Sequence, residues 1–561
     1  MATNSTRSSS SKKARAKERD VPSREPQVPV SEGLPENVWR IGIVVIFVIA
    51  AVLRLYDLNL VPLHHDEGVN GNFLVRLVRE GYYQYDPENY HGPTLYYFSA
   101  LIPWIVKLLF GNSARDNYGL TTFTIRLVPA VFGLATIALV FMLRRRLGTV
   151  ATLAAGMMLA VSPGAVYLSR YFIHESLFVF FTFGIVVASL KFYDERNPAY
   201  LIPAGASAAL LFATKETAFI SAGVLVIALG LTLLYMEFNR KPGRRRNREL
   251  TFLERIKDRL GPTIDDLGGT TAVAYNLGLA VVVFLALYLL FYSSFLTNNN
   301  GIWDSLRTFA VWKKTGGTAH VHESYQYIVW LLRQESPLLL LGAAGALIAV
   351  LKPRNSLALF AALWAFGLIA AYSMIGYKTP WLVLSFLIPL ALVSGHAIQA
   401  VYQMDHGRLR LASVIFLVAV GVAAFQAIDL NFVHYDDDDE KYVYVYAHSR
   451  REMLDLVKQV EQIANEQSGR TTGISIVSPD YWPLPWYFRN FSRVGYFGRM
   501  AATSEPIIIA NENQKEELDR NFGEVYRQVP SKSEGGSFEL RPGVKLLLYV
   551  RRVGVVPVQN P

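Results

Sequence analysis

Long apolar runs separated by short polar segments fill most of the chain between residues 40 and 428. Most of these runs approach the length of roughly 20 residues that a helix needs to cross the hydrocarbon core of a bilayer. The pattern therefore predicts about eleven membrane-spanning helices. We place them at residues 41–55, 127–143, 150–168, 177–192, 200–213, 219–236, 272–291, 338–351, 357–375, 382–401 and 411–428.

Two more helices are predicted between the first and second of these runs. Residues 66–80 have an amphipathic pattern, and residues 93–110 are apolar but are interrupted by Pro103 and Lys107. We expect both helices to lie along the membrane surface. The second is of borderline length for a span, but the arginines at 144–146 reach the same side as the N-terminus only if neither helix crosses.

Lys and Arg are concentrated in every second connection between the predicted spans, namely residues 144–148, 191–197, 241–259, 352–354 and 403–410. Basic connections of membrane proteins remain in the cytoplasm. The N-terminus is therefore expected to be cytoplasmic, and the segments around residues 64–67, 169–175 and 376–381 are expected on the other side. These features predict a multi-pass protein of the plasma membrane.

The chain divides into four predicted parts. Residues 1–39 form a basic cytoplasmic tail that is too polar to fold, and residues 40–428 form the transmembrane domain. Residues 429–447 are a linker. In residues 448–556, short β runs alternate with helical patterns, which predicts a small extracytoplasmic α/β domain. The expected fold class is a polytopic α-helical membrane protein with this C-terminal domain.

The composition of the chain limits which metal ligands and which partners are expected. The chain is 52% hydrophobic and has no cysteine, so any metal ion must be held by His, Asp or Glu. The net charge of +10 comes from basic residues beside apolar runs, which is the pattern of a membrane protein and gives no reason to expect a nucleic-acid partner.

The first candidate for chemistry is the sequence His64-His65-Asp66-Glu67, directly after the first apolar run. Ionisable groups beside a membrane are costly, which favours a functional role. Neighbouring side chains diverge by ~100° on a helix, so one of the two carboxylates is expected to act and the other to support it. We predict that Asp66 is a general base or metal ligand, and that Glu67 completes the catalytic pair by orienting a cation. The alternative is a helix N-terminal cap.

Three cationic or potentially cationic residues are candidates for binding a phosphate group: Arg170, Lys378 and His91. Arg170 has a planar guanidinium that suits phosphate oxygens, although it also fits a turn at the membrane surface. Lys378 lies on the face that is expected to lack positive charge, where a phosphate would give it a partner. By contrast, Lys215-Glu216 is interpreted as a structural ion pair.

Two further sets of residues are candidates for ligand contacts. A divalent metal site is predicted from His65, His174, Glu175, His320 and His322, with ordinary loop histidines as the alternative. Substrate contacts are predicted for Tyr377, Trp381, Trp482 and Trp486. The first two also suit an aromatic belt at the membrane surface, and the last two also suit the core of the small domain.

These motifs resemble the GT-C fold membrane glycosyltransferases of the dolichyl-phosphate-mannose protein mannosyltransferase-like superfamily. Three motifs carry the resemblance: Asp66-Glu67, Gly92-Pro93-Thr94-Leu95-Tyr96-Tyr97 and Ser169-Arg170-Tyr171. They match motifs of that superfamily in their order along the chain and in the membrane face on which they are expected. Residues 64–68, 169–175, 377–381 and 480–487 look most like the archaeal and bacterial "flippase activity-associated" subfamily, over residues 40–555.

The resemblance implies transfer of a sugar from a polyprenyl-phosphate donor to an acceptor hydroxyl on the extracytoplasmic face, with inversion. Asp66 would be the base, and Arg170 and Lys378 would stabilise the lipid phosphate. The acceptor would be a glycan, a lipid or a protein. Many relatives carry a lysine where this chain has His91-Gly92, which is a departure at the phosphate contact. The alternative is a non-enzymatic flippase, or flippase-associated protein, for a lipid-linked glycan; it would place charges deep within the spans.

Overall fold

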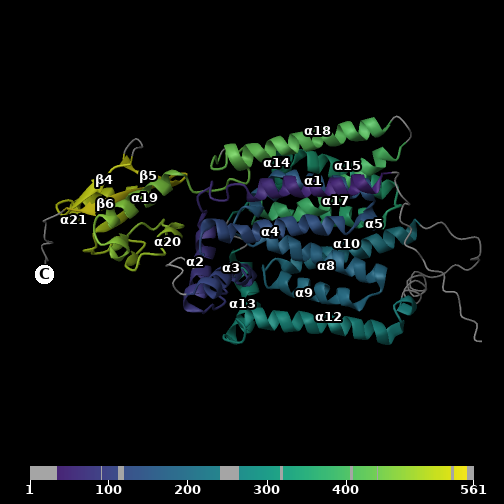
Figure 1. The fold of residues 1–561 in the computed structure, drawn as a ribbon, viewed down its shortest axis with the longest axis horizontal. Helices are drawn as coiled ribbons and strands as arrows, with labels where there is room; N and C mark the ends of the chain where they lie inside the picture. Colours follow the sequence, from purple (N-terminus) through teal and green to yellow (C-terminus); the bar gives the residue numbers. More distant parts are fainter. Residues whose placement is uncertain are drawn as a thin grey trace, which may run out of the picture.

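The computed structural model describes residues 34–89, 91–111, 119–239, 264–315, 320–404, 408–438, 440–531 and 536–552. The predicted basic loop at 241–259 and residues 1–33 of the tail lie outside these ranges. The described chain forms a bundle of long helices with a small sheet domain at one end (Figure 1).

Eight helices of the bundle are long and apolar enough to cross a membrane. They are α1 (Glu36–Leu55), α4 (Thr122–Phe141), α8 (Glu175–Glu195), α10 (Ala218–Phe238), α12 (Gly269–Tyr292), α16 (Ser356–Ser373), η2 with α17 (Pro380–Val383, Leu384–Tyr402) and α18 (Arg408–Ile428). The predicted polytopic helical fold is confirmed by these elements.

Two bent helix pairs raise the number to ten among the described residues if each pair is one span. They are α6 (Thr149–Val161) with α7 (Pro163–Ser169), bent by 59°, and α14 (Gln326–Gln334) with α15 (Ser336–Leu351), bent by 114°. Prolines explain both breaks, because a proline at the start of a helix lacks the N–H that would continue the previous one. The predicted span at 200–213 is the shorter helix α9 (Leu201–Phe212), which follows η1 (Pro198–Tyr200).

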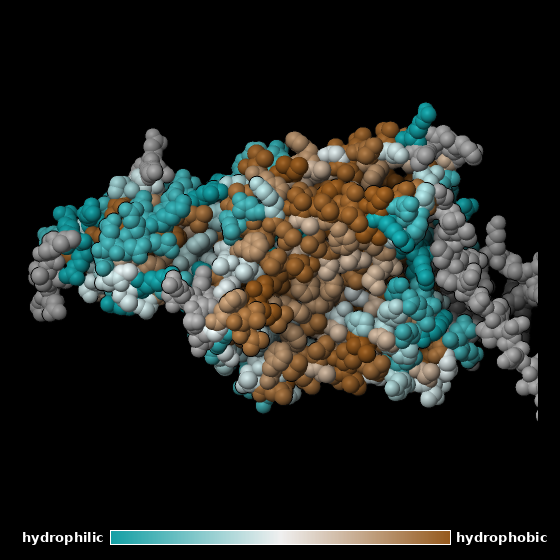
Figure 2. Space-filling model, viewed as in Figure 1, coloured by the Kyte–Doolittle hydropathy of each residue, from teal (hydrophilic) through white to brown (hydrophobic). Residues whose placement is uncertain are grey.

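The surface of the bundle carries a broad apolar band, with hydrophilic surface at both ends (Figure 2). Helix α17 lies in the centre and is nearly all buried, whereas the apolar helix α12 has almost no buried residue. The arginines of the short helix α5 (Arg144–Leu147) lie at the end of the bundle that is far from the small domain (Figure 1). The band and the two polar ends fit a bundle that stands across a bilayer.

Helices α2 (His65–Glu80) and α3 (Thr94–Phe110) lie between the bundle and the small domain (Figure 1). The second half of α3 exposes large apolar side chains, among them Leu108 and Phe110. Helix α13 (Asn300–Thr315) lies at the same end. The two predicted surface helices are therefore present at the bundle end where the candidate residues gather.

The small domain is built on one six-stranded sheet of order β2-β1-β3-β6-β4, with β5 paired to β6. Its strands are β1 (Ile474–Ile476), β2 (Val494–Tyr496), β3 (Ile507–Asn511), β4 (Tyr526–Val529), β5 (Phe538–Arg541) and β6 (Val544–Arg551). Its helices are α19 (Glu452–Asn465), α20 (Leu484–Tyr487) and α21 (Lys515–Phe522), with the short turns η4 (Gly469–Thr471) and η5 (Glu512–Gln514). The first three strands are parallel and the others antiparallel to their neighbours.

The chain between bundle and small domain is packed rather than loose. It begins with the π-helix η3 (Asp429–Val433). Residues 442–445 are buried in the core of the bundle, because they alternate Tyr and Val and supply apolar surface. The small domain also contacts α2 directly: a Cβ on Gly71 would lie only 2.6 Å from the indole of Trp486. The predicted linker therefore fixes the domain against the bundle.

Candidate active site

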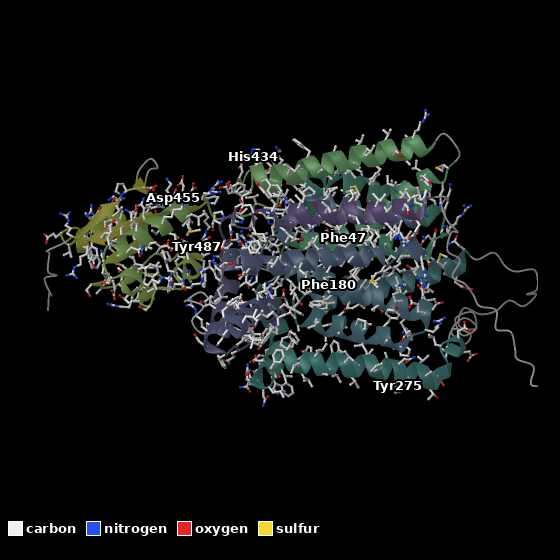
Figure 3. All side chains as sticks on the ribbon, viewed as in Figure 1. Phe47, Phe180, Tyr275, His434, Asp455 and Tyr487 are labelled. Carbon is white, nitrogen blue, oxygen red and sulfur yellow. The ribbon has the colours of Figure 1, made fainter. Side chains whose placement is uncertain are left out.

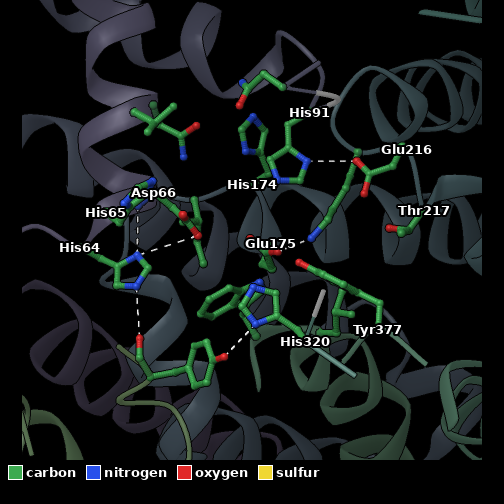
Figure 4. Close-up of a pocket in the computed structure, with 18 of the residues that line it drawn as sticks. His64, His65, Asp66, His91, His174, Glu175, Glu216, Thr217, His320 and Tyr377 are labelled. Carbon is green, nitrogen blue, oxygen red and sulfur yellow. Dashed lines mark hydrogen bonds and ion pairs between the residues drawn. The ribbon is translucent and has the colours of Figure 1, made fainter. Parts of the chain in front are cut away.

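A cavity of about 470 Å³ opens where the bundle meets the small domain (Figure 4). Of the predicted site residues, it brings together His65, Asp66, His91, His174, Glu175, His320, Tyr377 and Trp381. The other predicted residues, Glu67, Arg170, Lys378, His322, Trp482 and Trp486, do not line it. The cavity thus separates the candidates into two groups with different surroundings.

Asp66 lies in the first turn of α2, at the wall of the cavity. The imidazole of His64 caps this helix: its Nδ1 accepts the Asp66 N–H at 3.1 Å, and its Nε2 donates to the Tyr446 carbonyl at 3.2 Å. The same Nδ1 lies 3.8 Å from the Asp66 carboxylate. The side chain of Asp66 is 45% exposed and accepts no hydrogen bond from the residues that the structure describes. The helix N-terminus stabilises its negative charge.

Glu67 points away from the cavity into a buried clamp. Arg126 holds its carboxylate with two hydrogen bonds, Nε to Oε1 at 2.7 Å and Nη2 to Oε2 at 2.6 Å. The N–H groups of Phe172 and His64 donate to the same carboxylate at 2.8 and 3.0 Å. Glu67 does not line the cavity, and its place among the catalytic residues stays a prediction. Glu67 was predicted to orient a cation, and the cation that it contacts is Arg126.

The two cations predicted to bind phosphate are occupied elsewhere. Arg170 donates to the carbonyls of Tyr56 at 2.6 Å and Asp57 at 2.9 Å, at the end of α1, and covers the ring of Phe432. Lys378 donates to the carbonyl of His322 at 3.2 Å and lines a separate, open cavity. Both positive charges compensate backbone carbonyls, and neither residue lines the cavity that Asp66 lines; their contacts with a phosphate stay a prediction.

Lys215 is the lysine that lines the cavity instead. It lies in the loop between α9 and α10, and this loop packs on the segment before α3. Gly92 donates to the Thr214 carbonyl at 3.0 Å, and a Cβ at Gly92 would lie 2.0 Å from the Ala213 carbonyl oxygen. Only glycine fits there, so Gly92 allows the loop that carries Lys215 to pack closely on the segment before α3.

Lys215 and Glu216 do not pair with each other as predicted. Lys215 donates to Glu175, while Glu216 is 3.0 Å from Nδ1 of His91 (Figure 4). Burial disfavours the charge of Lys215, but Glu175 and Glu216 outweigh it and hold the pKa of Lys215 above its usual value. Burial likewise disfavours the charge of Glu216, but His91 and Lys215 outweigh it and lower the pKa of Glu216. The cavity therefore contains a fixed positive charge with two acidic partners.

The predicted metal ligands do not form one ligand set. Within the described ranges, no three His, Asp or Glu side chains are arranged to hold a metal ion. Glu175 is the partner of Lys215, and His174 donates from Nε2 to the Gly92 carbonyl at 3.1 Å. Nδ1 of His320 meets the Tyr446 hydroxyl at 2.7 Å, and His322 packs on Trp330 at the second cavity. The donor geometry therefore does not fit the predicted site.

The predicted aromatic contacts also divide into two groups. Tyr377 and Trp381 line the cavity, and the Trp381 ring lies 5.9 Å from that of His64. Trp486 is buried against α2, with its indole near Thr122, so it joins the two domains and is not available to a substrate. Trp482 is half-buried beside His65, with ring centroids 6.1 Å apart.

The residues not predicted as functional include Lys215, Tyr446 and Arg541 of the cavity lining, and Arg126, which holds Glu67. Lys215 carried the same signal as Lys378, a lysine on the face expected to lack positive charge. Arg126 is a lone arginine at the start of an apolar run, which is also costly. Tyr446 and Arg541 reach the cavity from the small domain and its linker, and nothing in the sequence pattern indicates this placement.

Comparisons with known proteins show which families and solved structures this chain resembles. A family model described as dolichyl-phosphate-mannose-protein mannosyltransferase matches residues 98–248. A search of curated proteins gives no match. The solved structure of ArnT from Cupriavidus metallidurans bound to undecaprenyl phosphate is similar, with a TM-score of 0.59 and 13% identity over 92% of this chain and 99% of ArnT.

The oligosaccharyltransferase of Archaeoglobus fulgidus is also similar. Its complex with zinc and sulfate gives a TM-score of 0.51 and 14% identity over 89% of this chain and 73% of that chain. Its complex with an inhibitory peptide and a dolichol-phosphate gives 0.51 and 13%, over 93% and 75%. The protein therefore has the GT-C fold that these membrane proteins share, with a C-terminal domain, as the sequence predicted. The narrower "flippase activity-associated" subfamily stays a prediction.

Proposed function

We propose that the protein is a membrane glycosyltransferase that moves a sugar from a polyprenyl-phosphate carrier to an acceptor hydroxyl. The observation that carries this proposal is that Asp66 and Lys215 line the same cavity at one polar end of the bundle. Transfer from a lipid phosphate needs a carboxylate at the attacking hydroxyl and positive charge at the leaving phosphate. A lipid phosphate lies at the level of the membrane surface, where this cavity opens.

Asp66 accepts the proton of the acceptor hydroxyl while the hydroxyl oxygen attacks the anomeric carbon of the donor sugar. The bond from this carbon to the phosphate oxygen breaks, and the polyprenyl phosphate leaves with the bonding electrons. Attack from the face opposite the phosphate inverts the anomeric centre. Lys215 then exchanges Glu175 for the phosphate, whose growing negative charge it stabilises.

The orientation in the membrane is part of this proposal. Basic segments lie at the bundle end opposite the cavity, which favours a plasma-membrane protein with a cytoplasmic N-terminus and an extracytoplasmic small domain. The cavity is confined to one end of the bundle, which favours transfer over a flippase, whose polar path would follow the length of the spans.

A divalent metal is a proposal separate from the transfer mechanism, because the predicted ligands do not form one set among the described residues. Elemental analysis of the purified protein, with and without prior chelation, tests whether a metal is bound. No step of the transfer described above depends on one.

The direct test of function is Asp66→Asn in the full chain, purified in lipid nanodiscs and supplied with a panel of polyprenyl-phosphate hexoses. We expect the release of polyprenyl phosphate to fall by about 10²–10⁴-fold, since general base catalysis is lost. Binding of undecaprenyl phosphate and the melting temperature are expected to stay unchanged. The matched control is Asp57→Asn, an exposed aspartate at the same end of the bundle and outside the cavity.

Full turnover in Asp66→Asn would refute the catalytic assignment. If the wild type turns over no hexose donor but still binds undecaprenyl phosphate, the flippase alternative is favoured.

A further inference from the structure

Aromatic side chains lead from the small domain to the cavity. The rings of Tyr496 and Tyr481 are 5.3 Å apart, and those of Tyr481 and Trp482 are 5.6 Å apart. Trp482 is followed by His65 at 6.1 Å, and His65 is the neighbour of Asp66 (Figure 4). We call Tyr496, Tyr481 and Trp482 the aromatic strip. It ends at His65, which lines the cavity and directly precedes Asp66, the residue that we assign as the base.

The strip is accessible and its polar atoms are free to bind. Tyr496, at the end of the edge strand β2, is 36% exposed, and Tyr481 and Trp482 are half-buried. Neither the two hydroxyls nor the indole N–H has a hydrogen-bond partner in the part of the chain that the structure describes. Flat rings with an apolar face and a polar edge suit a ligand that is itself apolar on one face and polar at its rim.

An ion pair lies beside the strip. Arg541, from β5, donates to Asp480, which directly precedes Tyr481. Arg541 also lines the cavity. A guanidinium only donates hydrogen bonds and a carboxylate only accepts them, so the pair complements hydroxyl groups, which do both.

We propose that the aromatic strip and the Arg541–Asp480 pair bind the sugar residues of a carbohydrate acceptor and guide its terminal hydroxyl to Asp66. A pyranose ring has an apolar face of C–H groups and hydroxyls at its edge, which matches these rings and this ion pair. This inference rests on the proposed transferase function and adds the class of the acceptor.

Two other acceptors fit the same surface less well. The hydrocarbon part of a lipid would be held by the apolar band of the bundle, whereas the visible face of the small domain is largely hydrophilic (Figure 2). A peptide would pair with an exposed strand edge, but the edge strand β2 has only the three residues Val494–Tyr496.

The test uses the full chain in lipid nanodiscs on two arrays, one of neutral and acidic oligosaccharides and one of peptides. We expect the wild type to bind one class of oligosaccharide. Tyr481→Ala/Tyr496→Ala is expected to weaken this binding by about tenfold or more, and Tyr481→Phe/Tyr496→Phe to restore most of it because the rings remain. Tyr325→Ala removes an exposed tyrosine from the same end of the bundle and serves as the control. If the double alanine variant is unfolded, Tyr496→Ala alone decides, since its ring is exposed.

Three results would overturn the proposal. The wild type binds no oligosaccharide, the folded alanine variant binds oligosaccharide as well as the wild type does, or the alanine variant loses peptide binding instead. The donor assay separates this failure from failure of the proposed function. Turnover of a polyprenyl-phosphate hexose without oligosaccharide binding rejects the strip only. If oligosaccharide binds through the strip but no donor is turned over, the role of the strip in carbohydrate binding is supported and the proposed transferase function is rejected.

Discussion

Asp66 and Glu67 are neighbours in sequence but belong to different regions of the molecule. The carboxylate of Glu67 is fully buried and accepts hydrogen bonds from Arg126, Phe172 and His64. These bonds use about all of the lone-pair positions that a carboxylate offers. The carboxylate of Asp66 is half-exposed in the cavity and accepts none from the described residues. The comparison shows that a satisfied charge holds the fold, while an accessible one is available for chemistry.

The same difference separates the cations. The positive charges of Arg170 and Lys378 are compensated by backbone carbonyls. Lys215 is held by the side chain of Glu175, at the wall of the cavity. A carboxylate partner can be exchanged for a phosphate more readily than a set of backbone carbonyls that ends a helix, because a carboxylate can turn away without disturbing the backbone.

The largest effect is expected from breaking the buried clamp. Arg126→Met leaves Glu67 charged and unpaired, which destabilises a protein by about 3–5 kcal/mol. We expect a strongly lowered melting temperature, measured by tryptophan fluorescence in nanodiscs. Arg76→Met, an exposed arginine of α2, is the control. The double variant Glu67→Leu/Arg126→Met should recover part of the loss, since no charge is left unpaired. A melting temperature equal to that of Arg76→Met would show that the clamp does not stabilise the fold.

The next effect concerns binding of the donor. In a Glu175→Gln background, Lys215→Met is expected to weaken binding of undecaprenyl phosphate by about 10–100-fold, since one hydrogen bond to a charged group is worth ~1.5–3 kcal/mol. Glu175→Gln removes the carboxylate that would otherwise be left unpaired. Lys378→Met is the matched control and should bind the lipid phosphate as the wild type does. Equal losses in both lysine variants would contradict the assignment of Lys215.

The smallest effect is a change in the pH dependence of stability. Because the folded-state pKa of Glu216 is lowered, its stabilising contribution is present above the unfolded-state pKa and is lost as the pH falls through the folded-state value. The difference in melting temperature between wild type and Glu216→Gln should therefore be constant near neutral pH and shrink in acid. We expect a difference on the order of 2 °C. A difference that grows in acid would have the wrong sign.

Most of the fold follows from the sequence because a membrane-spanning helix needs a long run of apolar residues, which is visible in the sequence. Every long apolar run predicted a helix that the structure contains. The break between α6 and α7 was not predicted, although Pro163 marks it, and neither was the helix α14 before Pro337. In the small domain, β2, β4 and β5 are only three or four residues long, too short for a clear alternating pattern.

The candidate site was only partly predictable, because a motif gives the chemistry of a residue but not its partner. Lys215 and Glu216 are adjacent and of opposite charge, yet each pairs with a residue distant in sequence, Glu175 and His91. Arg170 belongs to a recognisable motif, but its direction depends on where α1 ends. Such long-range contacts are set by packing, which local sequence does not encode.

The central claim is that a lipid phosphate is held at Lys215, facing Asp66. The most direct measurement is a cryo-EM structure of the full chain in nanodiscs with undecaprenyl phosphate. We predict phosphate density within hydrogen-bond distance of Lys215 Nζ, in the cavity that Asp66 lines, with Glu175 displaced from the lysine. Phosphate bound at Lys378 or Arg170, or outside this cavity, would contradict the account.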